Sequence, residues 1–323
     1  MSFKKFIENK INLKKNKKFV SIIGSNPSKS ARSPILWNRA FSKLKMNIKM
    51  FPLDVKDQNI GLLIKSLKKD NHFYASAVTL PYKEKVIKYL DEVDQTASEV
   101  GSVNLIIKSK NKLKGYNTDS FGCSFTLGKI YKRIKKVLII GCGGAGKACI
   151  VSTKNKYPKA KIYLFNRNLR KLKKFTKGIK FNKKNIKIIK NNKILRNLKN
   201  LDLIINTTSL GFDLEIPQIK SNYKFFTPIL FEDLRFDQLE TLENVKNKIS
   251  ENLIDTFYFL HSNSKAIIFD IIYKPHKTII LKIAEKIGLR SINGLEMNFM
   301  QAVKAFKIVN KKIKTKKIIQ VMK

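Results

Sequence analysis

A glycine-rich turn between an apolar run and a segment with helical spacing limits most strongly what this chain can fold into. The segment VLIIGCGGAGKAC, residues 137–149, has glycines in the order G-x-G-x-x-G. A buried strand that turns into a helix directs unpaired N–H groups and the positive helix dipole at one point, where residues without a Cβ let a pyrophosphate approach. The turn predicts a dinucleotide site, and a turn without ligand is the alternative. The predicted cofactor-binding residues are Gly141, Gly143, Gly144, Ala145 and Gly146.

The next strand-like run favours NADP over NAD. It spans residues 161–165 and ends in Asn166-Arg167, where an NAD site would carry an acidic residue for the ribose hydroxyls. A carboxylate would repel a 2′-phosphate, whereas a guanidinium can bind it with two charge-assisted hydrogen bonds. We therefore predict NADP as the cofactor, with Asn166 and Arg167 at its binding site. The alternative for Arg167 is a solvated surface charge.

The charge of the chain does not by itself indicate a nucleic-acid-binding protein. The formal net charge is +44 over 323 residues, but only 8 of the 67 basic residues are arginine. The lysines are spread from Lys4 to Lys323, without zinc-ligand spacing or an aromatic RNA-binding pattern. We expect no specific nucleic-acid partner, and only non-specific binding of polyanions at low salt.

Cysteine usage and hydropathy indicate a cytoplasmic protein. Cys123, Cys142 and Cys149 form no C-x-x-C pair and no disulfide framework. No run approaches the roughly 18 apolar residues that span a bilayer, and residues 1–18 lack the apolar core of a signal peptide. We expect neither a membrane partner nor a metal.

The hydrophobic pattern predicts an α/β protein of two domains. The expected strands are 19–23, 48–53, 75–79, 103–108, 137–140, 161–165, 201–206 and 266–272. The expected helices are 34–44, 59–69, 82–90, a connection after Asp119, 278–287 and 298–309. Gly24 to Pro27 reads as a turn.

Four further segments, with the glycine turn, resemble the shikimate dehydrogenase family in order and spacing. They are SNPSKSARSPILWN (25–38), VTLPYKEK (78–85), the pair VNLI (103–106) and GYNTD (115–119), and NGLEMNFMQAVKAF (293–306). The resemblance implies a substrate domain of residues 1–119 and 294–323, and a Rossmann-type NADP-binding domain of residues 120–293. It also implies reversible reduction of 3-dehydroshikimate to shikimate.

The resemblance also implies roles for particular residues. Lys83 and Asp119 are expected at the reacting oxygen. The implied substrate-binding residues are Ser33, Thr79, Asn104, Gln301 and Tyr273. The further implied cofactor-binding residues are Thr207, Gly294 and Met297. The alternatives are a solvated charge for Lys83, a turn residue for Asn104 and a polar helix-face residue for Gln301.

The chemistry explains why a lysine and an aspartate suit the reaction. Hydride transfer to a ketone builds negative charge on its oxygen, and an ammonium held by a carboxylate can offset that charge and supply the proton. The resemblance therefore implies that Lys83 and Asp119, far apart along the chain, meet in the fold.

The chain departs from the family pattern at three places, and two of them bear on the substrate. Ala31 stands where one of two carboxylate-binding serines is usual, and Ala77 stands where an asparagine is usual. Ser28 and Ser30 offer nearby hydroxyls out of register.

The third departure is an acidic and aromatic insertion that covers about residues 212–265. It is interpreted as surface elaboration, with a lid or a dimer contact as the alternatives. Dehydrogenation of quinate or another cyclic polyol is the alternative activity, and a cofactor-sensing or polyanion-binding protein is the alternative class. The expected state is a monomer or homodimer.

Overall fold

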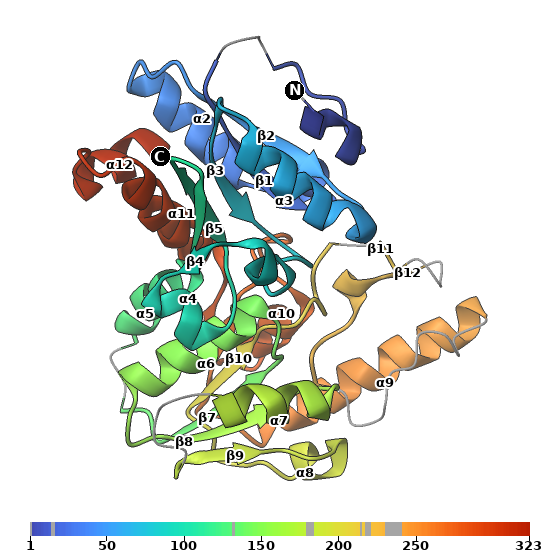
Figure 1. The fold of residues 1–323 in the computed structure, drawn as a ribbon. Helices are drawn as coiled ribbons and strands as arrows, with labels where there is room; N and C mark the ends of the chain where they lie inside the picture. Colours follow the sequence, from blue (N-terminus) through green and yellow to red (C-terminus); the bar gives the residue numbers. More distant parts are fainter. Residues whose placement is uncertain are drawn as a thin grey trace. The chain divides into compact units, whose positions relative to one another are not determined.

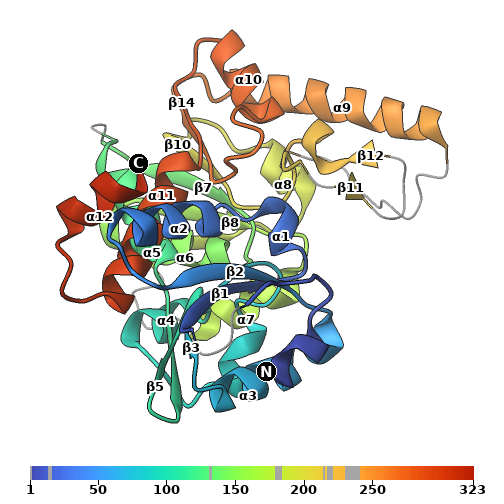
Figure 2. The ribbon, with the colours of Figure 1, turned by 90° about the horizontal axis from the view of Figure 1, so that it is seen from above.

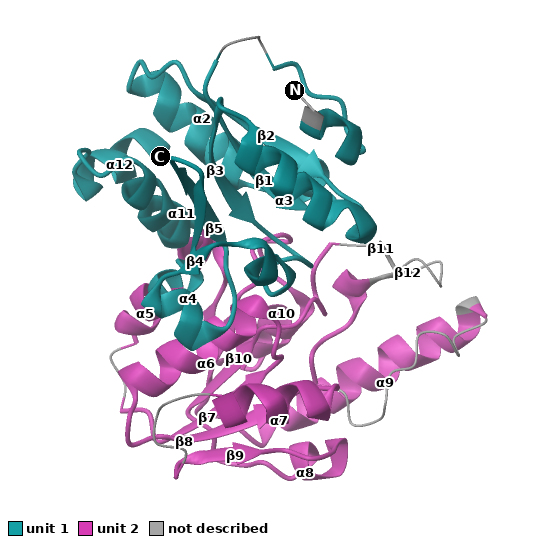
Figure 3. Ribbon diagram, in the orientation of Figure 1, with its two compact units in different colours: residues 1–122, 299–323 teal, residues 123–298 magenta. Residues whose placement is uncertain are grey.

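Two units divide the chain in its computed structural model (Figure 3). The structure describes residues 2–13, 17–130, 133–178, 184–213, 215–216, 221–229 and 241–323. Unit 1 comprises residues 1–122 and 299–323, and unit 2 comprises residues 123–298. Each unit contains one six-stranded sheet with helices packed on it (Figure 1). The chain is therefore an α/β protein in both units.

The sheet of unit 1 has the order β2-β1-β3-β5-β6-β4. Its strands are β1 (Phe19–Gly24), β2 (Lys49–Asp54), β3 (Phe73–Val78), β4 (Glu92–Val93), β5 (Leu105–Ser109) and β6 (Lys112–Tyr116). β1 pairs in parallel with β2 and β3, whereas β5 is antiparallel to β3 and to β6. The parallel strands β1, β2 and β3 end at one edge, and the loops that follow them begin there.

Side-chain alternation along β1 gives unit 1 an apolar layer on each face of its sheet. Phe19 and Ile23 belong to one cluster, and Val20 and Ile22 to the other, as the period of two in a strand requires. The helices of this unit are η1 (Ser2–Phe6), α1 (Pro27–Ser30), α2 (Ser33–Lys43), η2 (Asp57–Asn59), α3 (Ile60–Lys69), η3 (Lys85–Tyr89), α4 (Gln95–Val100) and α12 (Thr315–Met322). The returning C-terminal segment completes the layer that contains α2 (Figure 1).

The sheet of unit 2 is parallel throughout, with the order β14-β13-β10-β7-β8-β9. Its strands are β7 (Lys136–Ile140), β8 (Lys161–Phe165), β9 (Ile186–Ile188), β10 (Leu203–Asn206), β13 (Ile267–Asp270) and β14 (Ser291–Ile292). Numbered from β7, this is the dinucleotide-binding order 3-2-1-4-5-6. The order reverses between β7 and β10, so ligands of such sheets bind beyond the carboxyl ends of these two strands.

The helices of unit 2 alternate with its strands along the chain. They are α6 (Gly144–Lys156), α7 (Leu169–Gly178), α8 (Asn192–Arg196), α9 (Leu242–His261) and α10 (Ile279–Lys286), with η4 (Tyr223–Phe225). The helices α5 (Asp119–Gly128) and α11 (Leu295–Val309) cross the unit boundaries. α9 lies beside α10 (Figure 2), and Phe259 and Leu260 join the core under that face. β11 (Glu215–Ile216) and β12 (Ser221–Asn222) form a separate two-stranded ribbon.

Several expectations about elements were wrong. Residues 82–90 form turns and the short 3₁₀-helix η3 instead of an α-helix, because the carbonyl of Lys83 accepts a hydrogen bond from Val103 N instead of from a helical neighbour. The expected turn after Gly24 is present at Ser25 and Asn26, and the short helix α1, which was not expected, begins at Pro27. The expected insertion contains the helix α9, and its residues Phe231, Glu232, Asp233, Phe236, Asp237 and Glu240 lie outside the described residues.

Candidate active site and cofactor-binding turn

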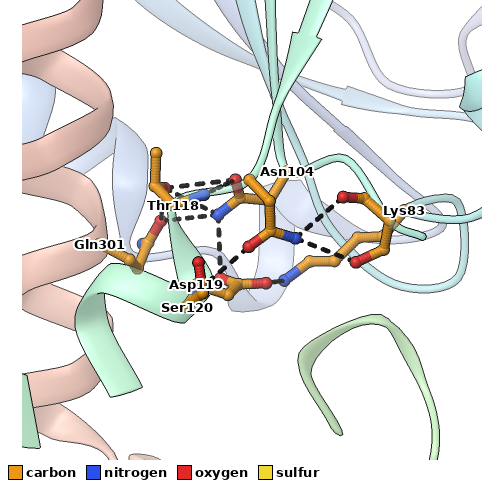
Figure 4. A network of polar contacts seen from close by, with 8 residues as sticks. Lys83, Asn104, Thr118, Asp119, Ser120 and Gln301 are labelled. Atoms are coloured by element: carbon orange, nitrogen blue, oxygen red, sulfur yellow. Dashed lines mark hydrogen bonds and ion pairs between the residues drawn. The ribbon is translucent and has the colours of Figure 1, made fainter. Parts of the chain in front are cut away.

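The ammonium of Lys83 contacts the carboxylate of Asp119 directly (Figure 4). Lys83 lies in the turn after β3, and Asp119 is the first residue of α5. The distance from Lys83 Nζ to Asp119 Oδ2 is 2.5 Å, and the two side chains are 15% and 7% exposed. An ion pair this little exposed is weakly screened by solvent. The residues expected to meet at a reacting oxygen thus do meet.

Asn104 links this ion pair to the C-terminal helix α11. Its Nδ2 donates to Asp119 Oδ1 at 2.9 Å, and it also approaches Thr118 Oγ1 at 2.9 Å and Gln301 Oε1 at 3.2 Å. Its Oδ1 accepts from the backbone N–H of Thr118 at 2.7 Å. Asn104 is 4% exposed. The amide of Asn104 therefore orients Asp119 and Gln301, so it is more than a turn residue.

Ser33 and Thr79 lie in the segments that follow the strands β1 and β3 of unit 1. Ser33 is the first residue of α2, and Thr79 follows β3 directly and donates its backbone N–H to Ile23 O. Both are half-buried. No hydrogen bond among the described residues joins either side chain to the Lys83–Asp119 network. Their roles in substrate binding stay predictions.

The out-of-register hydroxyls of Ser28 and Ser30 are engaged within the protein. Ser28 donates its hydroxyl to Asp54 Oδ2, and its backbone N–H donates to Asp54 Oδ1 at 2.9 Å. Ser30 donates its hydroxyl to Asn26 O at 3.2 Å. Ala31 itself is packed beside the apolar cluster under α2. Ser28 is thus committed to holding α1 against β2.

The glycine turn of unit 2 lies against the loop that follows β10. Gly141 has a φ of +109°, which an L side chain rarely adopts. A Cβ added at Gly141 would lie 2.4 Å from Thr207 Oγ1, and one at Gly146 would lie 2.6 Å from the same atom. Thr207 is fixed there because its hydroxyl donates to Ile140 O at 2.8 Å. Gly141 and Gly146 are therefore required by close packing at the point where the strand order reverses.

The remaining part of the turn is open toward the N-terminus of α6. A Cβ added at Gly143 would meet no atom within 4 Å, and Gly143 caps the 13-residue helix α6 without a side-chain hydrogen bond. Gly144 and Ala145 form the first turn, where the N–H groups and the helix dipole favour an anion. Asn166 Oδ1 accepts from Cys142 N at 3.1 Å, and Arg167 is exposed. This arrangement fits a dinucleotide with an additional phosphate.

Three further predicted residues lie in unit 2. A Cβ at Gly294 would lie 1.8 Å from Ile271 O, so this glycine is required by contact between two backbone segments. Met297 is 5% exposed, and Tyr273 is half-buried in the loop after β13. The contact at Gly294 explains how its segment packs against the loop after β13, and the roles of all three residues toward ligands stay predictions.

The residues that hold these loops in place carry no local signal in the sequence. Thr118, Asn117 and Ser102 surround the Lys83–Asp119 pair, and Asp270 lies under the loop of Thr207. The N-T-D triplet contained two of them, but only Asp119 was singled out. Their hydrogen bonds join distant segments, which a local pattern does not reveal.

Asp270 is a buried carboxylate without a cationic partner among the described residues. It is 0% exposed, and it accepts hydrogen bonds from Asn206 Nδ2 at 3.0 Å, Ile272 N at 3.0 Å and Thr278 Oγ1 at 2.7 Å. Burial raises the pKa of Asp270 to about 6, and the three hydrogen bonds oppose that shift. Asn206 in turn accepts from Thr208, so Asp270 supports the loop beside the glycine turn.

We expect stability to fall as the pH rises through the titration of Asp270. Between the unfolded pKa of 3.8 and the folded value of about 6, the folded state keeps a proton that the unfolded state has lost. At 1.36 kcal/mol per pKa unit, the unfolding free energy loses about 3 kcal/mol across this window. Asp270→Asn should therefore gain stability relative to the wild type from pH 4 to pH 7, as measured by urea unfolding followed by circular dichroism. A stability difference that stays constant over this range would contradict the titration of Asp270.

The described residues add three observations. No helix among them is long and apolar enough to cross a membrane. No group of three or more His, Cys, Asp or Glu side chains within the described ranges could hold a metal ion. Cys123, Cys142 and Cys149 are buried and form no disulfide.

Family comparisons identify relatives along most of the chain. The model of the shikimate dehydrogenase substrate binding domain matches residues 22–106, and that of the shikimate/quinate 5-dehydrogenase matches residues 127–212. A shikimate dehydrogenase (NADP+) from Halothermothrix orenii is 33% identical over 296 residues, which cover 87% of each chain. One from Methanococcus maripaludis is 29% identical and covers 90% of this chain and 91% of its own.

Solved structures have the same fold. A shikimate dehydrogenase determined in complex with NADP+ has a TM-score of 0.70 and 26% identity, and the match covers 96% of each chain. The Thermus thermophilus shikimate 5-dehydrogenase, determined with NADP(H) and shikimate, has a TM-score of 0.67 at 18% identity, over 94% of this chain and 98% of its own. At that lower identity the likeness concerns the fold.

Proposed function

Because this chain belongs to the shikimate dehydrogenase family, we propose that it reduces 3-dehydroshikimate to shikimate with NADPH, and that it also runs the reverse reaction. The observation that carries the proposal is the buried contact between Lys83 Nζ and Asp119 Oδ2. An ammonium paired with a carboxylate is the group that reduction of a ketone needs at its oxygen.

The residues of the glycine turn would hold the cofactor. The N–H groups at the start of α6 suit the pyrophosphate, and the open position at Gly143 leaves room for it. The exposed guanidinium of Arg167 suits the 2′-phosphate of NADP. When bound, NADPH supplies the hydride. Residues 120–293 form the proposed NADP-binding domain.

Lys83 would act at the ketone oxygen of the substrate. Negative charge develops on this oxygen as the carbonyl is reduced, and the ammonium offsets the charge and donates a proton to it. Asp119 holds the ammonium in place, and Asn104 fixes the other oxygen of the carboxylate. After the proton leaves, solvent must reprotonate the amine for the next turnover. Residues 1–119 and 294–323 form the proposed substrate domain.

The substrate hydroxyls would be bound by the polar groups around this pair. Gln301 accepts at its Oε1 from Asn104 Nδ2 and Thr118 Oγ1, which places its amide beside the ion pair, where it would bind a ring hydroxyl of the substrate. Thr79, directly after β3, and Ser33, at the start of α2, would supply hydroxyls, and Tyr273 is proposed as a further substrate-binding residue.

Steady-state oxidation assays test the proposal and its alternatives. We expect NADP+ reduction with shikimate at a kcat/KM at least about tenfold above that with quinate, the difference that one unmatched hydrogen bond supplies. A higher kcat/KM with quinate than with shikimate would identify quinate as the preferred substrate. NADPH binding without turnover of either compound would favour the cofactor-sensing class.

We also propose that the protein is cytoplasmic and acts as a monomer or homodimer. The three buried thiols without a disulfide support a reducing compartment. Light scattering after size exclusion measures the oligomeric state, and a stable higher assembly would contradict this part of the proposal.

A further inference from the structure

The segments that carry Lys83 and Asp119 are joined by a second set of contacts, which involves neither Lys83 Nζ nor the carboxylate of Asp119. The backbone carbonyl of Lys83 accepts from Val103 N at 2.7 Å. The adjacent Ser102 accepts two hydrogen bonds from Asn117 Nδ2, at 2.9 Å to its carbonyl and at 3.0 Å to its hydroxyl. Asn117 Oδ1 accepts from Ser120 N at 3.2 Å, at the start of α5.

These contacts close a circuit through the ion pair. The backbone of Lys83 bonds to Val103, and the adjacent Ser102 bonds to the side chain of Asn117. Asn117 bonds to Ser120 in the first turn of α5, and Asp119 in the same turn contacts Lys83 Nζ. Ser102 is 0% exposed and Asn117 is 5% exposed. Because water has little access to this side of the circuit, a bond lost there is not replaced by solvent.

The hydrogen-bonding capacity of Asn117 shows what it can do. Its amide has two N–H groups and one carbonyl, and all three are used within the circuit. Asn117 therefore has no donor left for a substrate. Its effect on a reaction must pass through the positions of the backbones that it joins.

The position of these backbones matters because the lysine side chain is long. Asp119 is fixed at its Oδ1 by Asn104, so its carboxylate has little freedom of its own. Lys83 has four side-chain torsions, and holding it in one geometry costs conformational entropy. A fixed separation between the two loops restricts where Nζ can meet Oδ2 and where it can present its proton. A misplacement of about 1 Å can cost about 10²-fold in rate.

We propose that Asn117 and Ser102 are positioning residues for the Lys83–Asp119 pair, and that the Asn117–Ser102 contact sets the separation of the two loops. The inference rests on the proposed function, in which this pair acts at the reacting oxygen. It predicts that loss of the contact lowers the rate of the chemical step and leaves the binding of NADPH and shikimate nearly unchanged.

The test compares three variants with a matched control. Asn117→Ala removes the whole contact, whereas Asn117→Asp keeps the acceptor for Ser120 N and loses both donors. Ser102→Ala removes only the hydroxyl acceptor and leaves the carbonyl. The control is Asn263→Ala in unit 2, because Asn263 is 1% exposed and also donates to two backbone carbonyls, those of Leu198 and Phe259, and accepts from Leu201 N.

We expect kcat to fall about 10- to 100-fold in both Asn117 variants, because a misplaced catalytic group costs up to about that much in rate. The KM values for the cofactor and for the substrate should stay within about threefold of those of the wild type. Ser102→Ala should lower kcat less than either Asn117 variant does. Asn263→Ala should lower the melting temperature and keep kcat within about twofold. If Asn117→Ala does not fold, Asn117→Asp and Ser102→Ala carry the comparison. Folded Asn117 variants with a kcat like that of the wild type would overturn the inference.

A second readout does not depend on turnover. Acetic anhydride labels lysines, and peptide mass spectrometry gives the labelling of Lys83 relative to the more exposed Lys85. We expect this ratio to rise several-fold in Asn117→Ala and to stay unchanged in Asn263→Ala. An unchanged ratio in both would also overturn the inference. If the wild type did not act on shikimate, the proposed function would fail, while the labelling ratio would still decide whether Asn117 holds the ion pair.

Discussion

Lys83→Ala is expected to lower kcat for reduction of 3-dehydroshikimate by about three orders of magnitude. Loss of a positioned general acid costs about 10²- to 10⁴-fold, and the negative charge on the oxygen also loses its stabilisation. The variant leaves Asp119 with its contact to Asn104 but without its cationic partner. The measurement is single-turnover oxidation of NADPH, with NADPH affinity determined separately by fluorescence.

Lys85→Ala is the matched control for this prediction. Lys85 lies two residues away and is also paired with a carboxylate, with Nζ 2.5 Å from Asp57 Oδ1, but its side chain is 48% exposed. Exposed pairs contribute little, so kcat should stay within about twofold of the wild type. Equal losses in both variants would mean that the turn, and not the ammonium of Lys83, is responsible. Full activity of Lys83→Ala would refute the proposed mechanism.

Gly141→Ala is expected to weaken NADPH binding about 1,000-fold, because the strained backbone and the clash together cost about 4 kcal/mol. The φ of +109° disfavours any L side chain, and the new Cβ would meet Thr207 Oγ1 at 2.4 Å. Relief of the clash must displace either the glycine turn or the loop after β10, and both border the proposed cofactor site. Fluorescence titration with NADPH measures the effect.

Two other glycines separate the causes of that effect. Gly128→Ala adds a Cβ that meets nothing within 4 Å at the end of α5, so it should fold at least as stably as the wild type and leave NADPH binding unchanged. Gly143→Ala also meets nothing within the protein, so we expect it to fold like the wild type and to weaken NADPH binding only where the pyrophosphate approaches. Unchanged affinity in both Gly141→Ala and Gly143→Ala would contradict a cofactor site at this turn.

The parts of the fold that were predictable from the sequence are those with a local signal. The strand 161–165 was predicted at its observed bounds, and the buried runs of β7, β10 and β13 were found within a few residues. α9 was missed although it has 20 residues. Its buried face includes Asn252 and Thr256, whose hydrogen bonds to Thr227 replace the apolar contacts that a hydrophobic period would reveal.

The meeting of Lys83 and Asp119 could be predicted only through the resemblance to a family. The two residues are 36 positions apart, and one basic residue among 67 carries no mark of its own. The resemblance also singled out Asn104 and Gln301, which the structure joins to the pair. It did not single out Asn117 or Ser102, because their partners depend on how two loops pack.

Local patterns in the chain predicted most of the strands and helices, the glycine turn and the basic residue after the second strand of unit 2. Those features depend on backbone conformation, side-chain periodicity and charge within short segments. The contacts of Ser28 with Asp54, of Gly294 with Ile271 and of Asn117 with Ser102 became known from the folded molecule. Hydrogen bonds and close packing act over a few ångströms, so they exist only where the fold brings distant segments together.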